Sequence, residues 1–337
     1  MLKRAKTLPE SPIFSQLPVR MITSGPAGVQ VAVHVHGTLS DDILPVICIP
    51  GYVRNMADFR HLPAAINQVP GTGLAFVLLD LPGRGRSTPL PRNLAYSTLL
   101  DADCVLDVLN ALDIGPAVLI GEGHGGQVAM LAAARQPTRI AGAVLVDSGP
   151  VTDSRGLVRT RTNFRHITEL RSPPAARAAL RKMLSTDYPG ESEARLDELA
   201  ERLYVQNPRG RLEALFDDRL IEQLEQFEFD DVLEPQWQLF GALAHAPLMI
   251  VRTQLSDQLR RATFDEMLRQ RPDAATLAIS GQGSPALLDG AEERDALAQF
   301  LIEVCRPPSG EKLMSFVPDD RLGLRNPTLS LDPPPKR

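Results

Sequence analysis

The residues with the clearest chemical arrangement lie between 118 and 130, where an apolar run leads into a glycine-rich turn and then into small residues. The turn, residues 121–125, reads Gly-Glu-Gly-His-Gly. A strand, a tight turn and a helix in this order form the elbow that presents the serine of G-x-S-x-G as a nucleophile. Gly123 stands at the serine position and has no side chain that could attack a substrate.

Glu122 and His124 are candidate acid–base groups, because carboxyl and imidazole groups commonly transfer protons. Neighbours of the central residue in such an elbow usually point into the surrounding structure, so we expect His124 to contribute mainly its backbone amide. No histidine and carboxylate set has a metal-ligand spacing such as HExxH, and the turn is a poor phosphate or dinucleotide fingerprint. The sequence therefore predicts neither a metal nor a cofactor.

Length and composition describe an ordinary globular chain of 337 residues, of which 43% are apolar and 23% charged. A net charge of −5 gives no overall electrostatic reason to bind nucleic acid or an anionic membrane. The apolar runs are too short for a membrane helix, and the basic first residues lead into Leu-Pro-Glu-Ser-Pro rather than a signal-peptide core. We expect a cytoplasmic protein without nucleic-acid or membrane partners.

Short apolar segments alternate with helical patterns along the chain, which predicts parallel strands joined by crossover helices. The segments are 46–49, 76–79, 118–120, 143–146, 248–251 and 275–279. An earlier stretch, 29–35, alternates apolar and polar residues and suits antiparallel strands at one edge of the sheet. Ser97 and Asp289 are placed to begin two of the helices. The expected fold class is α/β, a mostly parallel sheet flanked by helices.

About a hundred residues between two of these strands have helical periodicity and no strong strand, which is too much for one crossover. We interpret them as a helical lid over the sheet. The predicted organisation is an N-terminal extension (1–20), a core (21–150 and 246–305), a helical lid (151–245) and a Pro-rich C-terminal tail (306–337).

The lid and the tail each suggest a partner. Arginines concentrate in the first part of the lid, so Arg155, Arg159 and Arg161 are candidates to face an anionic ligand. Solvated helix faces that pair with acidic neighbours are the simpler explanation. Prolines recur throughout the tail, which is expected to pack along the body or stay disordered, with recognition by a protein partner as the alternative.

Further segments match the order and spacing of motifs in the α/β-hydrolase fold family, which the chain resembles over roughly residues 21–305. They are Ile49-Pro50-Gly51-Tyr52, Asp80-Leu-Pro-Gly83-Arg-Gly85-Arg-Ser87, residues 139–150 and residues 247–257. The resemblance implies a core of parallel strands with a lid after the segment 143–146. It also implies that the backbone amide of Tyr52 helps to hold a negative oxygen, together with that of His124.

The same resemblance implies a catalytic triad, whose positions fall on Gly123, Asp257 and Ser284. Only Asp257 has the expected residue type, because glycine stands for the nucleophile and serine, in the turn 280–285, stands for the histidine. An acid that orients a histidine has no catalytic effect by itself. Ser148 follows a predicted strand but has no glycine elbow around it, so we expect it to be a cap or turn residue rather than a replacement nucleophile. The other candidate bases all lie outside the expected turn; they are His34, His36, His61, His166 and His245.

We therefore expect an α/β-hydrolase-fold pseudoenzyme that binds a small molecule or a protein partner without serine-hydrolase activity. Amides at Tyr52 and His124 would hold a carboxylate, an ester or a similar polar group in a lidded cavity. Two alternatives stay open. One is an enzyme with non-triad chemistry, such as a lyase, cyclase or proton-transfer enzyme that uses Glu122, His124 or Asp257. The other is a hydrolase of esters or similar bonds with a displaced triad.

Overall fold

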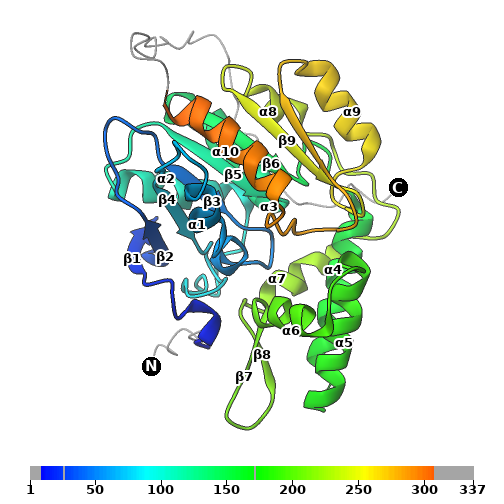
Figure 1. The fold of residues 1–337 in the computed structure, drawn as a ribbon. Coiled ribbons are helices and arrows are strands. Elements are labelled where there is room, and N and C mark those ends of the chain that lie inside the picture. Colours follow the sequence, from blue (N-terminus) through cyan, green and yellow to red (C-terminus); the bar gives the residue numbers. More distant parts are fainter. Residues whose placement is uncertain (1–8, 26, 171, 307–337) are drawn as a thin grey trace.

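An eight-stranded sheet forms the centre of the computed structural model, which describes residues 9–306 apart from 26 and 171 (Figure 1). The strands lie in the order β1–β2–β4–β3–β5–β6–β9–β10. Their bounds are β1 Arg20–Ser24, β2 Val29–His36, β3 Val46–Ile49, β4 Phe76–Leu79, β5 Ala117–Glu122, β6 Ile140–Val146, β9 Leu248–Thr253 and β10 Ala275–Ile279. The pairs β1–β2 and β2–β4 are antiparallel and all others are parallel. The predicted strands and the antiparallel edge are thus confirmed.

Helices cover both faces of the sheet, which explains why strands such as β3 and β4 consist of apolar residues that are all buried. One face is covered by α2 (Thr98–Ala111), α3 (His124–Arg135), α8 (Trp237–Gly241) and α9 (Arg261–Gln270). The other face is covered by α1 (Leu62–Asn67) and α10 (Ala291–Cys305). The predicted cap is confirmed at Ser97, whose side chain accepts from the Leu100 amide at 3.2 Å. The predicted cap Asp289 is wrong by one residue, because Gly290 precedes α10.

The helical segment predicted as a lid lies after β6 and packs around two apolar clusters, one of which it shares with core residues such as Val29, Val53 and Tyr96. It contains α4 (Ser154–Glu169), α5 (Pro173–Asp187), α6 (Glu193–Glu201), β7 (Tyr204–Gln206), β8 (Leu212–Ala214), α7 (Arg219–Glu222) and η4 (Gln223–Gln226). The β7–β8 hairpin was not predicted. Its turn is stabilised by the Asn207 side chain, which accepts from the amides of Arg209 and Arg211, and by Gly210 at φ 78°.

Segments at the predicted domain boundaries contribute to the core. Within the predicted lid range, Leu239 and Phe240 of α8 belong to the apolar cluster around α2 and α3. Within the predicted N-terminal extension, Ile13, Phe14 and Leu17 are buried in the cluster on the other face. The tail falls outside the described residues, except for its first residue, 306.

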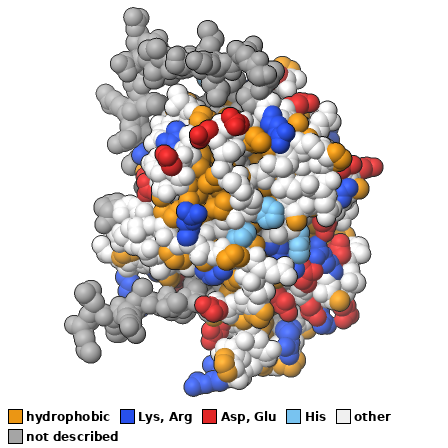
Figure 2. Space-filling model, turned by 60° about the vertical axis from the view of Figure 1, so that its left-hand side comes forward, with side chains coloured by type: hydrophobic (Ala, Val, Ile, Leu, Met, Phe, Trp, Pro, Cys, Tyr) orange, Lys and Arg blue, Asp and Glu red, His pale blue; other side chains and the backbone are white. Residues whose placement is uncertain are grey.

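No helix in the described residues is long and apolar enough to cross a membrane. Figure 2 shows acidic and basic side chains intermixed over one face of the molecule. The surface in this view therefore carries both positive and negative charge.

The turn between β5 and α3 depends on close backbone contact. A side-chain carbon at Gly121 would lie less than 3.0 Å from the backbone of Gly125, and one at Gly125 would lie less than 3.0 Å from the backbone of Ile49. Backbone atoms cannot move aside as a flexible side chain can. Glycine is therefore required where the strand, the helix and the neighbouring β3 meet.

We predict that Gly121→Ala lowers the free energy of unfolding by about 3 kcal/mol, because the added methyl group collides with the α3 backbone. Gly115→Ala is the matched control, since a carbon added there meets no atom within 4 Å. The control should change stability by less than about 0.5 kcal/mol. Chemical denaturation of both variants measures the difference, and equal stabilities would contradict the close-contact argument.

Candidate functional site

The elbow places Gly123 between the end of β5 and the start of α3, with φ 50° and ψ −112°. Its amide donates to the Val146 carbonyl at 2.9 Å, and its carbonyl accepts from the Gly126 amide at 3.1 Å. A side-chain carbon at Gly123 would lie less than 3.0 Å from Oε1 of Gln258, in the loop after β9. The Gln258 carboxamide therefore takes the space in which a nucleophile side chain would lie.

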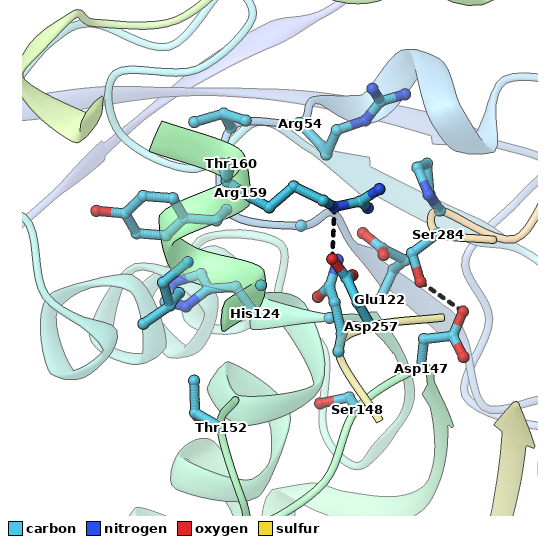
Figure 3. Close-up of a pocket in the computed structure, with 18 of the residues that line it drawn as sticks. Arg54, Glu122, His124, Asp147, Ser148, Thr152, Arg159, Thr160, Asp257 and Ser284 are labelled. Atoms are coloured by element: carbon cyan, nitrogen blue, oxygen red, sulfur yellow. Dashed lines mark hydrogen bonds and ion pairs between the residues drawn. The ribbon is translucent and has the colours of Figure 1, made fainter. Parts of the chain in front are cut away.

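A cavity of about 190 Å³ opens beside this turn, between the carboxyl ends of the strands and the lid. The core contributes Tyr52, Glu122 and His124 to its wall, and the lid contributes apolar residues of α4 and α5. Figure 3 shows its polar groups: His124 lies at one side, and Asp257, Ser284 and Asp147 lie at the other.

Asp257, the predicted retained acid, faces the lid. Its Oδ2 lies 2.5 Å from Nε of Arg159, which extends from α4 (Figure 3). Nη1 of the same arginine lies 2.9 Å from Asp187 at the end of α5. Arg159 thus joins two lid helices to the loop after β9, and the side chain of Asp257 is 29% exposed.

Ser284, at the predicted histidine position, faces a different acid. Its hydroxyl donates to Oδ2 of Asp147 at 2.6 Å, and Thr253 donates its hydroxyl to the same oxygen at 2.6 Å and its amide to Oδ1 at 2.8 Å. Asp147 is fully buried directly after β6, at φ 46°. Burial raises the pKa of Asp147, and the hydrogen bonds from Ser284 and Thr253 oppose that shift.

Asp147 is not among the site residues expected from the sequence. The only sequence signal for it is its place directly after a predicted strand, where the polar groups of an α/β fold gather. The carboxylate that contacts position 284 is thus Asp147, whereas Asp257 contacts Arg159.

The two amides predicted to hold a negative oxygen lie on separate elements. His124 is the first residue of α3, and the first amides of a helix have no acceptor within it. Tyr52 lies on the loop after β3, where its carbonyl accepts from Nε of Arg84 at 2.8 Å. Its hydroxyl donates to the Leu220 carbonyl at 3.1 Å, so the same residue connects this loop to the lid.

The imidazole of His124 lines the cavity and has a buried partner. Its Nε2 lies 2.8 Å from Oδ2 of Asp101, on α2. The Arg84 guanidinium donates to both Asp101 oxygens, at 3.3 and 3.2 Å. The Tyr52 ring meets the imidazole edge to face, with centroids 5.4 Å apart. The sequence predicts mainly an amide role for His124 and contains no signal for Asp101, which lies in a helix 23 residues earlier.

Glu122 lies beneath the loop after β3 and is only 4% exposed. The Gly51 amide hydrogen-bonds its carboxyl group, while Oε1 has no partner among the described residues. Burial raises the pKa of Glu122 to about 8, with Asp58 and Asp147 adding to the rise and Arg54 opposing it. At neutral pH this carboxyl group is mostly protonated.

Of the three lid arginines that sequence analysis selected, Arg159 lines the cavity. Arg155 pairs with Asp153, and Nη1 of Arg161 donates to backbone carbonyls of the lid. Among the cavity's described wall residues, His124 is the one histidine, and Ser148 is present with a buried hydroxyl that lacks a partner. The described residues contain no group of three His, Cys, Asp or Glu side chains arranged to hold a metal ion.

A family model described as the alpha/beta hydrolase fold matches residues 45–233. Two curated relatives match shorter stretches. One is the sn-1-specific diacylglycerol lipase ABHD11 of Danio rerio, 31% identical over 123 residues, which are 36% of each chain. The other is the pimeloyl-[acyl-carrier protein] methyl ester esterase of Chromobacterium violaceum, 41% identical over 73 residues, which are 22% of this chain and 26% of that one. The matches thus span about a third or less of either relative.

Solved structures match over most of the chain. An alpha/beta hydrolase from Novosphingobium aromaticivorans is 28% identical with a TM-score of 0.73, over 85% of this chain and 98% of that one. A thermophilic esterase from Thermogutta terrifontis is 21% identical with a TM-score of 0.62, over 86% of this chain and 99% of that one. The second similarity concerns the fold alone.

We predict that Glu122 makes the protein lose stability as the pH rises from about 4.5 to about 8. Between these values the folded state holds a proton that the unfolded state has released, so unfolding becomes more favourable by up to about 1.4 kcal/mol per pH unit. Glu122→Gln cannot release this proton and should flatten the curve. Urea unfolding of both proteins across this pH range measures the slopes, and identical slopes would contradict a raised pKa at Glu122.

Proposed function

The chain belongs to the alpha/beta-hydrolase fold family, and from that premise we propose that it binds a small molecule in the lidded cavity without serine-hydrolase chemistry. The observation that carries this proposal is the elbow itself. Gly123 supplies no attacking atom, and the Gln258 carboxamide fills the space that a nucleophile would need. A triad hydrolase has no first step at such a site.

The position of the missing histidine supports the same conclusion. Ser284 donates its hydroxyl to Asp147, so this acid orients a group that cannot act as a general base at neutral pH. Asp257 is neutralised by Arg159. Asp147 and Asp257 are thus each paired with a donor of this chain, and neither contacts an imidazole.

The cavity retains what ligand binding requires. Apolar lid residues line it together with many polar and charged groups, so it offers both apolar contact and hydrogen-bonding partners to a small molecule. The apolar wall comes mainly from Phe164, Leu184, Leu203, Leu224 and Phe227.

A second candidate function, ester hydrolysis by a displaced triad, is favoured by the curated relatives, which are named as a lipase and an esterase. Those names concern proteins that match this chain over 36% of its length or less. A protein partner recognised by residues 306–337 is a further proposal that is independent of the cavity.

We predict that native mass spectrometry of the purified full chain detects a bound small molecule. Thr160→Trp, which fills the cavity from α4, should abolish the mass shift, while Thr162→Trp on the exposed side of the same helix should retain it. A fluorophosphonate probe and a panel of activated esters should give neither labelling nor turnover with the wild type. Covalent labelling of the wild type would overturn the proposal and favour the displaced triad.

We also predict that a triad can be rebuilt. Gly123→Ser with Ser284→His, in a Gln258→Ala background that removes the collision, should hydrolyse activated esters at least about tenfold faster than either single change in that background. Adding Asp147→Asn should abolish the gain, because this acid faces position 284, whereas adding Asp257→Asn should retain it. Rates under saturating ester measure the effect, and loss on Asp257→Asn alone would reverse the assignment of the acids.

A further inference from the structure

The Asp101–His124 pair has no role in ligand binding as proposed above, although it forms part of the cavity wall. A carboxylate can only accept hydrogen bonds, so the imidazole nitrogen that contacts Asp101 must carry a hydrogen. Nε2 therefore stays protonated in both charge states of the ring. Nδ1 is the atom of His124 that gains and loses a proton.

Nδ1 is open to a ligand. Within the described residues it has no hydrogen-bond partner. It is also not among the buried side-chain atoms that lack a partner, so it is accessible. The ring forms part of the cavity wall, so the cavity is the space from which a proton donor can approach.

Two buried charged side chains hold the ring, Asp101 directly and Arg84 through Asp101. Asp101 is fully buried on α2, and Arg84 is fully buried in the turn after β4. Arg84 also donates to the carbonyls of Tyr52 and Pro82, so the guanidinium that fixes Asp101 is itself fixed by backbone. An oriented carboxylate beneath an imidazole holds the ring in one tautomer and one orientation, so the other ring nitrogen is the one that can accept a proton.

The backbone amide and Nδ1 of one histidine are separated by only a few bonds. Because His124 and Tyr52 line the same cavity, a ligand oxygen held at their amides would place its neighbouring atoms near the His124 side chain. Attack on a carbonyl carbon from the elbow side is obstructed by the Gln258 carboxamide above Gly123. This arrangement favours removal of a C–H proton over acyl transfer.

We propose that His124 is the catalytic base of a proton-transfer centre, with Asp101 and Arg84 as positioning residues. Its substrate class is carbonyl compounds with an acidic C–H bond next to the carbonyl group. The C–H bond breaks as the Nδ1–H bond forms, and the electron pair moves into a carbon–carbon double bond. The negative charge moves to the oxygen at the two amides, and the imidazolium then returns the proton to carbon. This activity rests on the proposed ligand cavity and goes beyond binding.

The test uses nitrobenzisoxazole, which reports a positioned base without knowledge of the natural ligand. Proton removal from its C–H bond breaks the N–O bond and gives a nitrile and a coloured phenolate, so no other reactant is needed. We expect the full-length wild type to accelerate this reaction at least about 100-fold over buffer at equal pH. His124→Gln should remove the acceleration, and His166→Gln, an exposed histidine on α4, should retain it.

A pH–rate profile separates a positioning role of Asp101 from a merely structural one. The charged and titratable groups around the imidazole are Asp101 on α2, Arg84 after β4 and the Tyr52 hydroxyl on the loop after β3. Asp101→Asn removes the carboxylate that fixes the tautomer of the ring, so the plateau of the profile should fall. Circular dichroism and a thermal melt establish whether each variant is folded. If His124→Gln does not fold, His124→Asn replaces it in the test.

The outcomes distinguish this inference from the proposed function. A saturable thermal shift with nitrobenzisoxazole but no turnover would overturn the proton-transfer centre and leave ligand binding intact. Turnover that survives in His124→Gln would also overturn it. Absence of both binding and turnover overturns it too, and if native mass spectrometry also finds no ligand, the proposed function fails with it.

Discussion

The contact between β5 and α3 is the constraint on which the rest of the structure depends. Gly121 and Gly125 allow the strand, the helix and the Ile49 backbone to meet at distances that a side chain would prevent. Glu122 ends the strand and His124 begins the helix, so the positions of both groups follow from backbone packing. A family elbow without its nucleophile keeps this geometry because the glycines, rather than the serine, determine it.

Charge buried around the elbow stabilises the site only because it is paired. Arg84 and Asp101 are both fully buried, and removal of one partner from such a pair costs about 3 to 5 kcal/mol. The arginine also satisfies the Tyr52 carbonyl, so one guanidinium connects α2, the loop after β3 and the imidazole of His124. A purely apolar cluster would fill the same volume without orienting a ring nitrogen toward the cavity.

The helical segment after β6 contacts the core through charge as well as apolar packing. Arg159 pairs with Asp187 in the lid and with Asp257 in the core, so an anionic ligand would have to compete with two carboxylates for one guanidinium. Burial raises the pKa of Glu122 to about 8, so this carboxyl group adds little negative charge to the cavity at neutral pH. The role of the lid arginines toward an anion stays a prediction.

Local patterns determined the sheet, most helices and the elbow, because apolar periodicity, the Ser97 cap and the glycine spacing act over a few residues. They also determined that position 123 has no nucleophile. Only the tertiary structure decided that Asp147 rather than Asp257 faces Ser284, since that contact joins residues 137 apart. The partner of His124 was likewise decided by the packing of α2 against α3. Sequence order carries no information on such distances, because the order of strands in the sheet, and not the order in the chain, brings these side chains together.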